Sequence, residues 1–163
     1  MIGAAMKKID WKNLSYDDFT GFVAVTAFLL FVLYFGGLWY ATYDYRIQMR
    51  DQMVEMYKQL PNPIPPIEDD YGVHQRWLVF YIDGVKVLNK PQPENVINEY
   101  KKALEKEGWA TEREYEHVRN DKNKIYGINM RKGEFILSVS ARENRDSINI
   151  HLIKRDWIYN KGF

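Results

Sequence analysis

The sequence predicts an α+β protein in which a single N-terminal transmembrane helix continues into a helical stalk and leads to a small soluble domain. Three observations predict this layout. Residues 19–43 contain no Asp, Glu, Lys, Arg or His, and four prolines stand between positions 61 and 66. Beyond residue 73, apolar and polar residues alternate with a period of two in several segments, which is typical of β-strands.

Composition limits the class of protein. In a chain of 163 residues, one span leaves room for one small soluble domain. A formal net charge of +1 argues against a dedicated nucleic-acid binder, which would carry a large basic excess. The chain has no cysteine, so thiol catalysis, disulfides and thiolate metal sites are excluded.

Residues 1–14 precede the span and are predicted to form either a polar tail or an interfacial helix. Ile2, Met6 and Ile9 recur at helical spacing, as in a helix that lies on a membrane surface. Ser15 is predicted to cap the following helix, because its hydroxyl oxygen can accept a hydrogen bond from the backbone N–H three residues later.

The span is predicted at residues 19–43 of a helix that covers residues 15–60. A helix rises about 1.5 Å per residue, so this segment crosses a hydrocarbon core of about 30 Å. A cleaved signal peptide is the alternative, but the apolar run exceeds the usual length of such peptides and no A-x-A site follows it. Lysines and arginines are balanced on the two sides. Charge therefore does not decide the orientation. The layout of a signal anchor instead predicts that the C-terminal domain is extracytoplasmic.

The stalk, residues 44–60, has good helix formers and no Gly or Pro. Its apolar stripe is predicted either to pack on a partner helix or to fold back on the chain's own domain. We assign this stripe to partner binding, together with a glycine pair in the span that lets a neighbouring helix approach. The predicted partner-binding residues are Met49, Met53, Met56, Leu60, Gly36 and Gly37.

Residues 61–72 are predicted to form a proline-rich, semi-rigid linker, and residues 73–163 the soluble domain. The predicted order is β-α-β-β-β-β, with one helix on an antiparallel sheet. Asp83-Gly84 is the expected turn after the first strand. Pro93 opens the helix and Gly108 closes it. The predicted strands cover residues 77–82, 109–119, 125–131, 135–141 and 148–152.

No group of residues predicts catalysis, a cofactor or a metal. His74, His117 and His151 fall in three separate predicted elements without the spacing of a metal site, although two of them can meet across a sheet. Ser138 and Ser140 lack the nucleophile elbow of a hydrolase. Three glutamates at positions 112, 114 and 116 alternate on one strand, as on a solvated strand face.

These observations predict a non-enzymatic, single-pass, membrane-anchored structural or accessory subunit of a larger membrane protein complex. Its predicted partners are the lipid bilayer and other membrane subunits, with no nucleic acid and no small-molecule substrate. The alternative is a membrane-tethered binding module for a glycan, peptide or lipid headgroup. The layout resembles that of bitopic scaffold subunits in bacterial envelope machines, such as inner-membrane alignment proteins of pilus and secretion systems.

Overall fold

The structure is a computed structural model that describes residues 16–76, 79–89, 91–118 and 123–155. It divides into two compact units, one ending at Asp44 and one beginning at Tyr45. The predictions for residues 1–14 and for the Ser15 cap lie outside the described residues.

The first unit contains helix α1 (Tyr16–Ala41). Its segment Phe19–Ala41 is long and apolar enough to cross a membrane, and none of it is buried in the chain. A signal sequence near an N-terminus has the same features. The single helix predicted over residues 15–60 is wrong, because a turn at Thr42 separates α1 from α2 (Tyr43–Lys58). The Thr42 hydroxyl donates to the Leu38 carbonyl over 2.8 Å, a back-bond that commonly perturbs helices.

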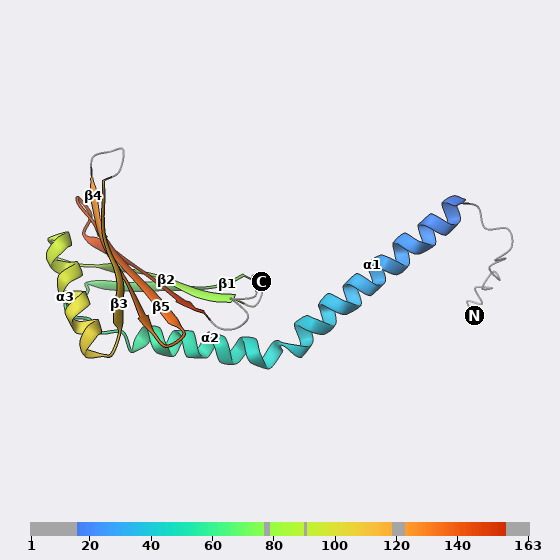
Figure 1. Cartoon of the computed structure of the whole chain (residues 1–163), viewed down its shortest axis with the longest axis horizontal. Helices are drawn as coiled ribbons and strands as arrows, with labels where there is room; N and C mark the ends of the chain where they lie inside the picture. The colour runs from blue at the N-terminus through green and yellow to red at the C-terminus, as the bar shows by residue number, and fades with distance from the viewer. Residues whose placement is uncertain (1–15, 77–78, 90, 119–122, 156–163) are drawn as a thin grey trace. The chain divides into compact units, whose positions relative to one another are not determined.

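The second unit is an antiparallel six-stranded sheet with helices, so the α+β class is confirmed (Figure 1). The strand order is β1-β2-β6-β5-β4-β3. Helix α3 (Pro93–Lys106) carries the chain from β2 to the opposite edge, and a meander then returns it to β2. The strands are β1 (Glu68–Arg76), β2 (Val79–Val87), β3 (Ala110–Val118), β4 (Lys124–Lys132), β5 (Phe135–Arg142) and β6 (Ser147–Lys154).

Two predicted boundaries differ from the structure. Strand β1 begins inside the predicted 61–72 linker and adds a strand to the predicted order, because β2 pairs with it along its whole length. The compact unit begins at Tyr45 and not at residue 73, because α2 contributes to the core. The stalk is therefore part of the domain.

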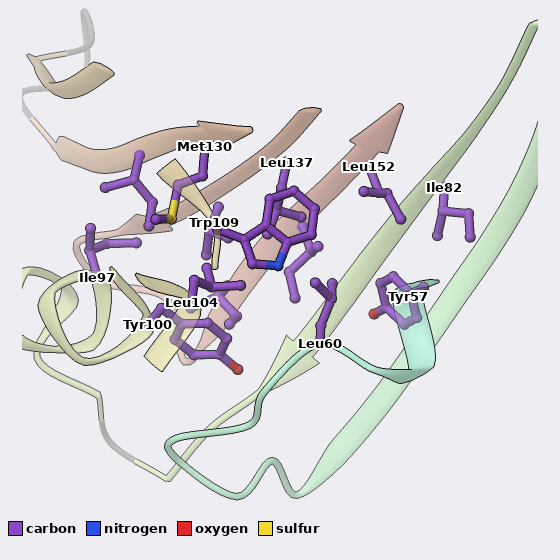
Figure 2. Packing of buried hydrophobic residues seen from close by; sticks show 14 of the residues in the cluster. Tyr57, Leu60, Ile82, Ile97, Tyr100, Leu104, Trp109, Met130, Leu137 and Leu152 are labelled. Carbon is purple, nitrogen blue, oxygen red and sulfur yellow. The ribbon is translucent and has the colours of Figure 1, made fainter. Parts of the chain in front are cut away.

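The apolar stripe of α2 faces the chain's own sheet. Met49, Met53 and Leu60 are buried, and Met56 is half-buried against the same core. In Figure 2, Tyr57 and Leu60 point into the core that also holds Ile82 of β2. The assignment of Met49, Met53 and Leu60 to a partner is corrected, since burial in the chain's own core leaves them no surface to offer. Met56 keeps part of its surface, and its role in partner binding stays a prediction. Gly36 and Gly37 have open space around them, and their role stays a prediction.

Helix α3 covers the other half of the same sheet face. It buries Val96, Ile97, Tyr100 and Leu104 and contacts β3, β4 and β5. As predicted, Pro93 stands in its first turn, where no N–H partner is needed. Gly108 has a φ of +83°, so the left-handed end of the helix is also confirmed.

The contact of α2 with the sheet depends on a glycine within β2. The predicted turn at Asp83-Gly84 is wrong, since both residues lie in β2. A Cβ on Gly84 would lie 2.7 Å from Tyr57 Cζ, so the ring occupies the space that a side chain would take. The Tyr57 hydroxyl donates to Asp69 Oδ1 on β1 over 3.0 Å. Tyr57 thus holds the helix against two strands.

A buried lysine lies beside this contact. Lys86 of β2 is 1% exposed, and its ammonium lies 3.0 Å from Asp69 Oδ2. The same ammonium donates to the Asn62 side chain and lies 5.4 Å from the centre of the Tyr57 ring. A buried charge requires such partners, because the interior solvates it poorly. Lys86 therefore ties α2, the segment after it and β1 to β2.

Replacement of Gly84 by alanine tests the docking of α2. We expect Gly84→Ala to lower the free energy of unfolding by about 1–3 kcal/mol, because the new methyl group overpacks against Tyr57. Denaturant unfolding of the full chain in mild detergent measures this loss. Val85→Ala, on the other face of the same strand, is the control and should have a smaller effect. An unchanged stability of Gly84→Ala would contradict the contact.

Two buried tyrosines predict a loss of stability at high pH. Burial raises the pKa of Tyr57 and Tyr100 well above the ordinary value of 10.0, and the carboxylate of Asp69 adds to both increases. Above pH 10 the unfolded chain loses phenolic protons that the folded chain keeps, so the free energy of unfolding falls as pH rises. In the double variant Tyr57→Phe/Tyr100→Phe this fall should be shallower. An equally steep fall in denaturation curves recorded above pH 10 would exclude these tyrosines as its source.

Candidate functional site on the open face of the sheet

The sheet has one covered face and one open face. Along β2, β5 and β6, every second side chain is buried under the helices, and the residues between them are partly or fully exposed. The helices of the same unit, α2 and α3, pack on the first face, and we call the second face the open face. It is a surface where side chains are positioned by a rigid sheet and are not used for core packing.

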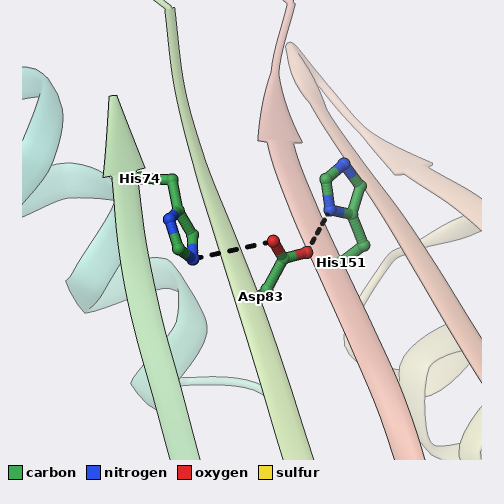
Figure 3. A network of polar contacts seen from close by, with 3 residues as sticks. All are labelled: His74, Asp83 and His151. Carbon is green, nitrogen blue, oxygen red and sulfur yellow. Dashed lines mark hydrogen bonds and ion pairs between the residues drawn. The ribbon is translucent and has the colours of Figure 1, made fainter. Parts of the chain in front are cut away.

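Two histidines and an aspartate meet at one end of the open face. His151 Nδ1 donates to Asp83 Oδ1 over 2.7 Å, and His74 Nε2 lies 3.7 Å from Asp83 Oδ2. Figure 3 shows both rings turned toward Asp83 from the strands on either side of it. Each of the three side chains is about half exposed. The carboxylate is thus shared between two imidazoles at the surface.

The local sequence allows this arrangement. Gly72 is paired with Asp83 across β1 and β2, and a Cβ on Gly72 would lie 2.9 Å from His74 Nε2. The missing side chain gives the His74 ring the room to lean toward Asp83. Tyr81 lies between the two imidazoles, with ring centroids 5.1 Å from His74 and 5.5 Å from His151.

A row of polar residues continues from this cluster across the open face. Each member is directly paired with the next on the neighbouring strand. Side chains of directly paired residues share one face of the sheet, so the row forms a polar line across five strands. The row is Asp83 (β2), His151 (β6), Ser138 (β5), Asn129 (β4) and Arg113 (β3).

The far end of the row opens into a shallow depression over β3, β4 and β5. A Cβ on Gly127 would lie 2.7 Å from Tyr115 Cε2, so the Tyr115 ring lies directly over β4. The ring provides an apolar surface among polar side chains. The depression is lined by Arg113, Tyr115, Glu116, His117, Ile125, Asn129, Ser138 and Ser140.

The three histidines are divided between these two places. His74 and His151 meet across the sheet through Asp83, whereas His117 lies in the depression. Ser138 and Ser140 are on the open face, with Ser138 paired to His151 in register. Within the described ranges, no three His, Asp or Glu side chains have a geometry that holds a metal ion.

The predicted row of three glutamates on one strand face is wrong. A bulge between Thr111 and Arg113 shifts the register of β3, so the three carboxylates do not share one face. Each pairs with a different basic side chain. The pairs are Glu112–Arg131 at 3.6 Å, Glu114–Lys101 at 2.6 Å and Glu116–Lys124 at 2.7 Å.

Sequence reasoning missed Asp83 and Arg113 as site residues. The sequence predicts a turn at Asp83. However, the alternation of buried Phe80 and Ile82 with outward-facing Tyr81, Asp83 and Val85 continues through it, and could have placed Asp83 on the outer side of a strand. Arg113 gains its place only from the register of β3 with β4. Comparison with known proteins finds no family model and no curated protein that matches this chain.

Substitution of two aspartates on adjacent strands distinguishes a residue that stabilises the fold from one that is free to serve a function. Asp69→Ala should lower the free energy of unfolding by about 3–5 kcal/mol, because it leaves Lys86 buried without its carboxylate. Asp83→Ala should lower it by less than about 1 kcal/mol, since its contacts with His74 and His151 are half exposed. Denaturant titration of both variants gives the comparison. Equal losses would show that Asp83 serves the fold.

Proposed function

We propose that this protein is a non-enzymatic, single-pass, membrane-anchored structural or accessory subunit of a larger membrane protein complex. Helix α1 anchors the chain in the bilayer, and the open face of the sheet contacts a partner subunit. The observation that carries the proposal is α1 itself. Its apolar segment Phe19–Ala41 has 23 residues, of which none is buried in the chain.

The exposure of α1 supports membrane anchoring because an apolar surface of this size is unstable in water. A hydrocarbon core of about 30 Å covers a helix of this length. The segment carries no charged side chain, so it offers no proton relay or ion pathway of its own. Gly36 and Gly37 have no heavy atom near their Cβ positions, which leaves room for a neighbouring helix.

The open face supports a role in contact with a partner. Its polar side chains neither fill the core nor hold the helices, so they are available to contact a partner. Asp83 and His151 lie on adjacent strands and are joined by a hydrogen bond of 2.7 Å, so this part of the surface is preorganised and loses little conformational freedom on binding.

The signal-anchor layout favours a location of the second unit outside the cytoplasm. A reporter that is active only outside the cytoplasm, fused after Phe163, should therefore be active. Activity of a cytoplasmic reporter at the same position would show the opposite orientation. Release of the fusion from the membrane would indicate a cleaved signal sequence.

Site-specific photocrosslinking tests the subunit proposal. The full chain is expressed in its own source cells with a photoreactive residue at Asp83 on the open face, or at Glu105, an exposed position of α3. After purification in mild detergent, we expect membrane proteins to copurify and one of them to crosslink from position 83 and not from position 105. Recovery as a lone monomer, with no crosslink from either position, would contradict the proposal.

A further inference from the structure

We infer that the depression over β3, β4 and β5 binds an extended, acidic peptide segment of the partner subunit. This inference rests on the proposed function and names the chemistry of the contact. The anchoring group is Arg113, at the end of the polar row, and the side chains around it match a short stretch of carboxylate-bearing peptide.

The charge of the depression is complementary to an acid. The Arg113 guanidinium is exposed and, among the described residues, forms no ion pair or hydrogen bond. His117 has no such contact there either. The lining carboxylate, Glu116, is neutralised by Lys124 at 2.7 Å. A guanidinium binds a carboxylate through two parallel hydrogen bonds, which makes it the strongest anchor this surface offers.

The remaining groups fit a peptide backbone. Asn129, Ser138 and Ser140 are partly buried, and their side chains form no hydrogen bonds with the described residues. They supply both donors and acceptors for N–H and C=O groups. Neighbouring strands lie about 4.8 Å apart, so the two steps from Ser138 to Arg113 span about 10 Å, the length of about three extended residues.

The edge of the sheet at β3 is unsuited to binding the peptide as an added strand, so we expect the peptide on the open face. Strand β3 is an edge strand, but it carries a bulge and a run of charged residues, Glu112, Arg113, Glu114 and Glu116. Such features disfavour the addition of another strand. The Tyr115 ring, which lies over Gly127, instead gives the peptide an apolar surface on the open face.

Selection from a random short-peptide display library tests this inference. The bait is the full chain in nanodiscs of zwitterionic lipid, and the enriched peptides are measured by fluorescence anisotropy. We expect enriched peptides to share Asp or Glu and to bind more weakly as salt increases. Arg113→Glu should reduce their affinity about tenfold or more, the loss expected for one charge-assisted pair. Arg145→Glu, the same charge change in the exposed turn between β5 and β6, should not.

Three results would overturn the inference. The first is that the enriched peptides lack acidic residues, and the second is that Arg113→Glu and Arg145→Glu lose equal affinity for the peptides. The third is that the chain binds phosphatidylglycerol vesicles or an oligomer of glucuronic acid in place of the peptides. If Arg113→Glu still crosslinks to its partner from position 83, the subunit proposal stands and the acidic-peptide inference fails. If no partner copurifies with the unaltered chain, the proposed function itself fails.

Discussion

Tyr57 fills the space above Gly84 of β2, and the position of α2 on the sheet depends on this contact. Beside it, Lys86 is buried and needs the Asp69 carboxylate and the Asn62 amide. These partners come from α2, the segment after it, β1 and β2, so none of these elements can leave without exposing or orphaning a polar group. The result is one unit from Tyr45 onward, in which α2 and α3 share one face of the sheet and the other face stays open.

Features with local signals could be predicted from the sequence. Pro93 and Gly108 bound α3, and the alternation of the last four strands placed them within a few residues. Strand β1 could not be predicted, because its residues are mostly polar and its pairing with β2 is a tertiary effect. Asp-Gly is a common hairpin signal, so the sequence predicts a turn at Gly84. In the structure this glycine instead makes room for the ring of Tyr57, which lies far away in the sequence. The meeting of His74 with His151 through Asp83 follows from the strand order, which no local pattern encodes.

The two faces of the sheet divide the work of the domain. The covered face carries the core, including Lys86 and the two buried tyrosines, and its substitutions act on stability. The open face carries the cluster around Asp83, the polar row and the depression around Arg113. With α1 as the proposed anchor, this division suits a subunit that presents one rigid surface to a neighbour. Because Met49 and Met53 of α2 are buried in the core, the open face and the span are the main proposed contacts with a partner.

Cysteine accessibility tests whether a partner covers the open face in the native membrane. The chain has no cysteine, so each introduced thiol is the single reactive site. Ser138→Cys on the open face and Glu105→Cys on α3 are labelled with a maleimide in permeabilised native membranes and again after purification. If a partner covers this face, we expect the thiol at position 138 to be protected in membranes and reactive after purification, while the thiol at position 105 reacts in both. Equal reactivity at position 138 in both preparations would contradict it.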